Sequence, residues 1–248
     1  MQAVARATLA SVAFLTRIPV GRRVDLDAGD VGRGAVLFPL VGGAVSAVAG
    51  LVADLLTGPM PSLIAGAIAV GTAALLTGAM HLDALADTAD ALGATTRAQA
   101  LEIMRDHAVG AFGTVALALV CLVDAAALGA LGSLGKGALV GLAAGAAGRA
   151  GMLPLARLLP YARTGAGQGR VLEHLGLTGT IVGVLVAVLL ALPVGWAGLA
   201  CVGAAAVVTI LLGLYYRYWL GGVTGDLLGA AAKLCETAGL VAAVVVLT

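Results

Sequence analysis

Apolar stretches of about twenty residues recur along the whole of this 248-residue chain, and they limit what it can fold into. The mean hydropathy is +1.08, and 61% of the residues are hydrophobic whereas only 11% are charged. A helix of about twenty apolar residues crosses a hydrocarbon core about 30 Å thick. The sequence therefore predicts an all-α integral membrane fold, a single polytopic domain of about seven transmembrane helices, with spans near 34–56, 61–81, 109–131, 137–158, 177–194, 197–219 and 226–248.

The basic residues orient these spans. If the chain enters the first span from the cytoplasm, the loops at 17–33, 82–108, 157–176 and 217–225 all face inward. Those loops hold ten arginines, Arg17, Arg22, Arg23, Arg33, Arg97, Arg105, Arg157, Arg163, Arg170 and Arg217, and the opposite loops hold only Lys136. An excess of Lys and Arg marks cytoplasmic loops. We therefore expect the polar motifs described below to lie on the cytoplasmic face.

Residues 1–16 form a short apolar segment that Arg17 closes, and no small-residue cleavage pattern follows it. We expect an N-terminal interfacial helix here rather than a signal peptide. Cys121, Cys201 and Cys235 fall inside spans without metal-ligand spacing. The formal net charge of +1 gives no reason to expect nucleic acid as a partner, and the lipid bilayer is the expected surrounding.

The densest polar stretch is His81 to Gly113, HLDALADTADALGATTRAQALEIMRDHAVGAFG. Asp83, Asp87 and Asp90 are spaced i, i+4, i+7, which puts three carboxylates on one face of an acidic cytoplasmic helix. Crowded carboxylates repel one another unless a cation lies between them, and oxygen ligands suit Mg²⁺ shared with substrate phosphates. The alternative is a solvated helix between two spans with no metal.

Three further segments have the composition of a phosphate site. The glycines in 109–113 open a span, and backbone amides at a helix start attract anions. Residues 165–170, GAGQGR, follow Tyr161 and Arg163 and end in Arg170, and guanidinium groups bind phosphate oxygens in a forked geometry. Residues 221–229, GGVTGDLLG, place Asp226 among glycines at the inner end of the last span.

Several ionisable residues fall inside the spans, where they are costly and mark functional sites. Arg149 and Glu236 each lie about 14–15 Å from the cytoplasmic end of their span, so we expect them to pair. The pair is either functional or a device that fixes helix register. Lys233 lies one turn nearer the cytoplasm. Asp124 lies deeper and has no evident partner in the sequence, and Asp54 lies near an outer helix end.

Glycine is abundant inside the spans, as at Gly141, Gly145, Gly148 and Gly151. Small residues allow helices to approach closely in lipid. The stripe favours packing within one chain, and a contact between copies in a homo-oligomer is the alternative.

The motifs resemble those of a known family. HLDALADTADAL followed by LEIMRDHAVGAFG, the early FLTRIPV and FPLVGG, and the late TGDLLGAAAKLCE occur in the order found in adenosylcobinamide-GDP ribazoletransferase, the cobalamin synthase family. The similarity runs from about Phe14 to Glu236. It implies a Mg²⁺-dependent transferase in a bacterial or archaeal cell membrane that joins adenosylcobinamide-GDP to α-ribazole, or to its 5′-phosphate, and releases GMP.

The resemblance also assigns roles to residues. Asp83 and Asp87, with Asp90, are the expected Mg²⁺ ligands. Arg97, Arg105, Arg163 and Arg170 are candidates for binding phosphate charge, and Asp226 is the remaining candidate for substrate or cofactor binding. The base that takes the proton from the attacking hydroxyl is His107, His81 or one of the three aspartates.

Two other classes of protein remain as alternatives. A CDP-alcohol phosphotransferase also carries an Asp-rich helix at the cytoplasmic face, but its usual Asp-Gly, Ala-Arg and paired Asp pattern is not found in this sequence. A small-molecule transporter would be expected to show an internal inverted repeat and charged or broken helices at mid-membrane. We find no such repeat, and the acidic cluster falls in a loop.

Overall fold

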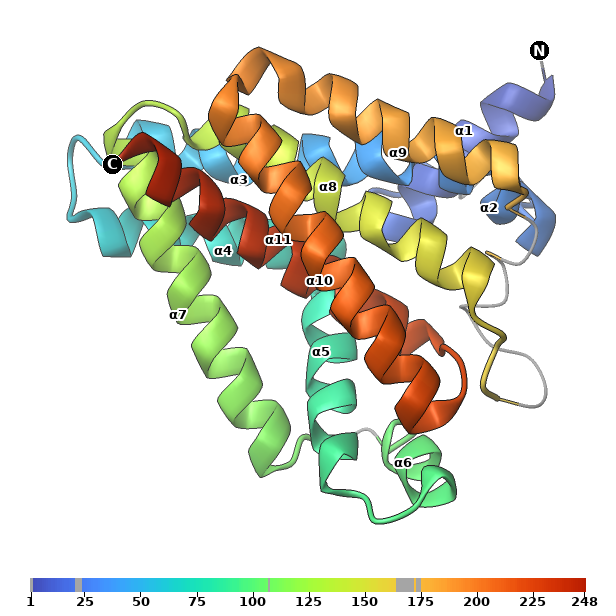
Figure 1. Cartoon of the computed structure of the whole chain (residues 1–248). Helices are drawn as coiled ribbons and strands as arrows, with labels where there is room; N and C mark the ends of the chain where they lie inside the picture. The colour runs from blue at the N-terminus through green and yellow to red at the C-terminus, as the bar shows by residue number, and fades with distance from the viewer. Residues whose placement is uncertain (1, 21–23, 107, 164–171, 173–174) are drawn as a thin grey trace.

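A computed structural model describes residues 2–20, 24–106, 108–163, 172 and 175–248 of the chain. Within these ranges the regular structure is helical, and the one β-bridge is isolated, so the predicted all-α fold is confirmed (Figure 1). Six helical segments are long and apolar enough to cross a membrane, or seven if one bent pair of helices counts as a span. These helices fit a multi-pass membrane protein.

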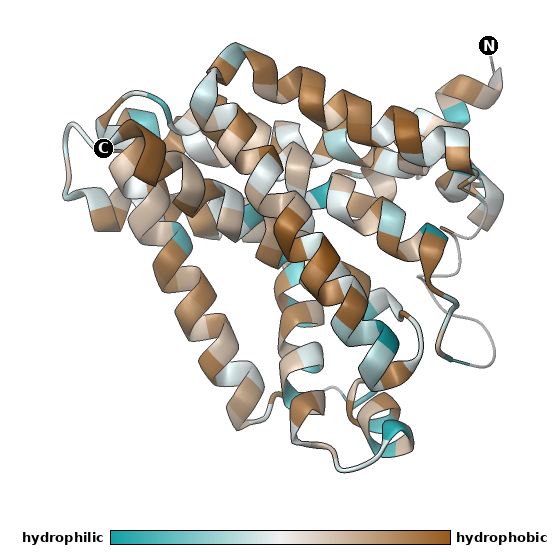
Figure 2. Cartoon of the chain, in the orientation of Figure 1, coloured by the Kyte–Doolittle hydropathy of each residue, from teal (hydrophilic) through white to brown (hydrophobic). Residues whose placement is uncertain are grey.

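The long helices match the predicted spans closely. α2 (Ala28–Gly34), a 3-10 turn and α3 (Phe38–Leu56) form one segment of 29 residues. The others are α7 (Ala111–Ser133), α8 (Gly137–Leu158), α9 (Leu177–Ala191) with the 3-10 turn η4 (Leu192–Val194), α10 (Trp196–Leu220) and α11 (Gly225–Leu247). Figure 2 shows apolar residues along α7, α9 and α10, whose surfaces are largely exposed, as expected for helices that face lipid.

The predicted span at 61–81 is different in the structure. α4 (Ser62–Thr77) has 16 residues, and the chain then turns by 95° into α5 (Met80–Asp90). Gly78 and Ala79 adopt left-handed φ angles of 64° and 58°, which end the helix. Arg17 stabilises the break, because its amide donates to the carbonyl oxygen of Leu76 at 2.8 Å. The acidic helix therefore starts at this break, inside the bundle rather than in a loop.

α8 lies at the centre of the bundle and packs mainly against α3 and α11. The predicted glycine stripe makes these approaches possible within one chain. A side chain at Gly141 or Gly145 would collide with the backbone of α3, and one at Gly151 would meet Cys235 of α11. α7 packs along α4 and α5.

The N-terminal segment forms α1 (Gln2–Leu15), which packs against α2 and α3. The Ser11 hydroxyl donates to the Gly34 carbonyl at 2.6 Å, and the Phe14 ring stacks on Phe38 with 5.5 Å between centroids. An ion pair joins Arg6 to the buried Asp30 at 2.5 Å. α1 is thus fixed to the bundle, which brings Phe14 near the base of α5.

Candidate functional site

α5 and α11 lie side by side and form two walls of the site (Figure 1). Gly229 makes the close approach possible, because a Cβ atom there would lie 2.6 Å from the Cβ of Ala84. The helices run in opposite directions, since Asp87 shares a cavity with Asp226 whereas His81 shares another with Lys233. Polar residues from the end of one helix therefore meet those from the start of the other.

A cavity of about 370 Å³ opens where these helices meet α1, α8 and the segments after α6 (Arg97–Ile103) and after α8. The predicted site residues that line it are Asp83, Asp87, Arg105, Arg163 and Asp226. Its other lining residues are Phe14, Met80, His81, Ala84, Met104, Met152, Tyr161, Leu172, Gly225, Leu228 and Gly229. Three carboxylates and two guanidinium groups, from segments distant in sequence, thus face one space.

A short backbone connection places Arg163 beside Asp226. Val223 donates its amide to the Pro160 carbonyl at 2.9 Å and accepts from the amide of Ala162 at 2.8 Å. The bridge ties the segment after α8 to the start of α11, and the Arg163 guanidinium then reaches the Asp226 carboxylate at 2.8 Å. Thr224 caps α11 by accepting a hydrogen bond from the Leu227 amide at 3.2 Å. The ion pair is thereby held at the mouth of the cavity.

Asp90 has a different place from Asp83 and Asp87. Its carboxylate accepts hydrogen bonds from the amides of Gly110 at 2.7 Å and Gly113 at 2.8 Å, at the start of α7. A Cβ atom on Gly110 would lie 2.5 Å from the carboxylate, which explains the glycine there. The anion that the sequence predicted at these amides is therefore Asp90 itself, and Asp90 is not among the residues that line the cavity.

The remaining predicted residues are not brought into the cavity. The guanidinium of Arg97 donates to the carbonyl of Ala162 at 3.3 Å and lies outside the lining. His107 and Arg170, with the glycines around position 167, lie outside the described residues. The sequence did not single out Phe14, Met80, Met104 or Met152. The quoted motif FLTRIPV contains Phe14, but single apolar residues give no signal for a site in a chain this apolar.

The donor set of the cavity fits a hard divalent cation. Asp83, Asp87 and Asp226 offer oxygen atoms alone, and such cations retain several waters beside one or two carboxylates. Among the described residues no three His, Cys, Asp or Glu side chains are grouped closely enough to enclose a metal ion by themselves. The arrangement therefore suits an ion completed by water and phosphate oxygens rather than a cage made by the protein.

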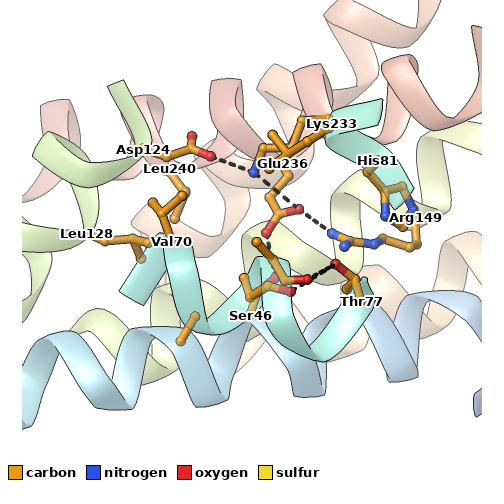
Figure 3. A pocket seen from close by; sticks show the side chains of 14 residues that line it. Ser46, Val70, Thr77, His81, Asp124, Leu128, Arg149, Lys233, Glu236 and Leu240 are labelled. Atoms are coloured by element: carbon orange, nitrogen blue, oxygen red, sulfur yellow. Dashed lines mark hydrogen bonds and ion pairs between the residues drawn. The ribbon is translucent and has the colours of Figure 1, made fainter. Parts of the chain in front are cut away.

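A second, smaller cavity of about 40 Å³ lies deeper in the bundle and holds the buried charges (Figure 3). Arg149 forms an ion pair with Glu236, as predicted, and the Ser46 hydroxyl donates to the same carboxylate at 2.5 Å. Asp124 does have a partner, which the sequence did not reveal, because Lys233 Nζ lies 2.5 Å from its carboxylate. His81 lines both cavities, and its ring nitrogens have no hydrogen-bond partner in the described chain.

Asp54 is explained by a helix cap. Its carboxylate accepts hydrogen bonds from the amides of Gly137 at 2.7 Å and Ala138 at 2.9 Å, at the start of α8. Charged acceptors at a helix start satisfy amides that have no partner within the helix. Asp54 thus caps the start of α8 in the same way as Asp90 caps the start of α7.

Comparisons with known proteins cover nearly the whole chain. The sequence model of the family described as cobalamin-5-phosphate synthase matches residues 7–244. Adenosylcobinamide-GDP ribazoletransferase of Allorhizobium ampelinum is 37% identical over 246 residues, covering 93% of each chain. The proteins of the same name from Shigella flexneri and Acinetobacter baumannii are 37% and 32% identical, covering 94% and 90% of this chain and 97% and 91% of their own. No solved structure gives a significant match.

Proposed function

Because the chain belongs to the cobalamin-5-phosphate synthase family, we propose that it joins adenosylcobinamide-GDP to α-ribazole, or to its 5′-phosphate, and releases GMP. Its relatives are named as ribazoletransferases, and the chain is accordingly a transferase of cobalamin biosynthesis. The observation that carries the proposal is the cavity in which Asp83, Asp87, Asp226, Arg105 and Arg163 converge. Carboxylates and guanidinium groups around one space are what a diphosphate substrate and its cation require.

In the proposed reaction a ribose hydroxyl of α-ribazole attacks the phosphorus that bears the cobinamide group. A new P–O bond forms, the bond to the GMP phosphate breaks, and GMP leaves with the electron pair of that bond. Arg105 and Arg163 bind phosphate oxygens, and the Asp226 carboxylate keeps the Arg163 guanidinium in position. Phosphoryl transfer depends mainly on such positioning and charge stabilisation.

Asp83 and Asp87 would hold Mg²⁺ together with water and phosphate oxygens, while Asp226 is paired with Arg163. When bound, the ion supplies positive charge that offsets the charge on the diphosphate and the departing GMP. The hydroxyl proton passes to a group at the cavity, for which His81 and the carboxylates are the candidates among the described residues. The Asp90 carboxylate already accepts hydrogen bonds from two backbone amides at the start of α7, so it is not one of the proposed ligands.

We also propose that the site faces the cytoplasm. Arg105 and Arg163 belong to two of the loops that together hold ten arginines, and these loops are cytoplasmic under the positive-inside rule. Both substrates are charged or strongly polar, and a site open to the cytoplasm receives them without their crossing the membrane.

The test is release of GMP by the purified full-length protein, given adenosylcobinamide-GDP and each acceptor, with Mg²⁺ and with a chelator. We expect Asp83→Asn to lower the rate by about a hundredfold or more, because an amide retains the size of the side chain but loses most attraction for the cation. Glu102→Gln is the matched control, since Glu102 is an exposed carboxylate of α6 outside the cavity. Normal turnover by Asp83→Asn with unchanged Mg²⁺ dependence would refute the metal assignment.

A further inference from the structure

The cavity changes in character with depth along the elements that line it. On α5, Asp87 lies at the cytoplasmic end, Asp83 follows one turn deeper, and Met80 lies about 10 Å from Asp87 along the helix. On α11, Asp226 comes first and Leu228 lies deeper. Counted from the cytoplasmic end of each helix, the charged residues therefore come before the apolar ones. The cavity has a charged mouth and a mainly apolar floor, beside which His81 lies.

Thioether side chains dominate the apolar part. The chain has five methionines, and three of them, Met80, Met104 and Met152, line this one cavity. Met104 and Met152 are only 3% and 5% exposed, and both line the cavity. The ring of Phe14, held by its stack on Phe38, completes the apolar surface. Methionine sulfur atoms make favourable contacts with aromatic rings.

We infer that this apolar floor, formed by Met80, Met152, Leu228 and Phe14, binds the aromatic base of the acceptor nucleoside and selects it. The inference rests on the proposed function. α-Ribazole is a riboside of dimethylbenzimidazole, a flat base with a hydrocarbon ring and two methyl groups. With that base on the floor, its ribose extends toward Asp83 and Asp87, where the hydroxyl meets the diphosphate.

The guanine base of the other substrate fits the floor poorly. Guanine carries several hydrogen-bond donors and acceptors, and an apolar surface would leave them without partners, at a cost of about a tenfold loss of affinity for each buried group. The charged mouth, with Arg105, Arg163 and Tyr161, suits the GDP portion instead. The two substrates thus occupy opposite ends of one cavity.

The experiment compares three methionine variants of the full-length protein in detergent. Met80→Gln keeps the length of the side chain and adds polarity, Met80→Leu restores an apolar side chain, and Met60→Gln makes the same exchange outside the cavity. We expect Met80→Gln to raise the KM for α-ribazole about tenfold and to change the KM for adenosylcobinamide-GDP less than twofold. Met80→Leu should recover most of the loss, and Met60→Gln should behave as the parent.

A series of acceptors tests the same floor in the unmodified protein, whatever the variants do to folding. Each methyl group removed from the benzimidazole should lower kcat/KM about fourfold, and the α-riboside of adenine should be a poorer acceptor than any benzimidazole. An equal response to adenine and dimethylbenzimidazole, or a rise in KM for the corrinoid substrate alone in Met80→Gln, would overturn the inference. Absence of GMP release with every acceptor would instead refute the proposed function.

Discussion

The buried pair of Arg149 and Glu236 gives the most demanding test of the fold. Both side chains are nearly inaccessible, at 4% and 7% exposed, in the middle of an apolar bundle. Arg149→Met removes the guanidinium and keeps an apolar stem, and Glu236→Gln removes the charge of the carboxylate. Each single change leaves the other residue charged and buried, whereas the double change leaves neither.

The structure sets the expected magnitude. Breaking a buried ion pair by removal of one partner costs about 3–5 kcal/mol. After Arg149→Met, Glu236 retains the Ser46 hydroxyl at 2.5 Å and Lys233 at 3.9 Å, so we expect the lower end, about 3 kcal/mol. For a chain of this size that loss lowers the melting temperature by about 6–12 °C. The double variant should lose about 1–2 kcal/mol, because the stranded charge is gone.

The assay is thermal unfolding in detergent of the parent, the two single variants and the double variant. Arg157→Met is the matched control, because Arg157 is an exposed arginine in the last turn of the same helix, and its melting temperature should remain unchanged. The coupling energy of the cycle should be about 4 kcal/mol or more, since each single change costs about 3 kcal/mol or more and the double change about 1–2 kcal/mol. If the two single losses simply add, Arg149 and Glu236 are not partners, and the packing of α8 against α11 is wrong at the depth of this pair.

Three other predictions concern separate parts of the chain. Asp90→Ala should lower the free energy of unfolding by about 1–2 kcal/mol and speed amide exchange at the start of α7. The affinity for Mn²⁺, used as a probe of the proposed Mg²⁺ site, should stay unchanged, and its loss would restore Asp90 as a ligand. Gly229→Leu should abolish GMP release, because α11 must move away from α5, and retained activity would show that their close contact is dispensable. Cysteines placed at the exposed positions Ala98 and Ser133 should react with a membrane-impermeant reagent from opposite sides of the membrane, and equal accessibility would contradict the assigned topology.

Hydropathy predicted the long helices well because a membrane span must be a helix of nearly fixed length. At 61–81 the structure departs from a single straight helix, because a turn divides this apolar run into α4 and α5. Gly78 gives a weak local signal, but Ala79 in a left-handed conformation gives none, since alanine favours helix. The break depends on Arg17, more than fifty residues away, whose amide bonds to Leu76. Such a tertiary contact has no signature in a local window.

Depth along a helix predicted the pairing of Arg149 with Glu236, because two charges in hydrocarbon need partners at the same level. The same reasoning did not find the partner of Asp124, because it placed Asp124 deeper than Glu236 and Lys233 one turn nearer the cytoplasm, whereas Lys233 Nζ lies 2.5 Å from the Asp124 carboxylate. Helical spacing also grouped Asp90 with Asp83 and Asp87, and periodicity does not reveal which of three aligned carboxylates binds the backbone of another helix. The sequence predicted the residue types at the cavity, and only the structure shows that Asp90 caps α7 whereas Asp83 and Asp87 line the cavity.

α11 lines both cavities, because its Asp226 faces the larger cavity and its Glu236 faces the smaller one. These residues are ten positions, or about 15 Å, apart on one helix. Ion pairs near the centre of a helix oppose its sliding or rotation, so we expect the buried network to fix where Asp226 lies relative to Asp83 and Asp87 in the cavity. The double variant Arg149→Met with Glu236→Gln therefore separates two roles. If stability and GMP release recover together, the pair only fixes the register of α8 and α11. If stability recovers without activity, at least one of the two charges acts on the substrate site. His81 lines both cavities and is therefore the residue through which such an effect would pass.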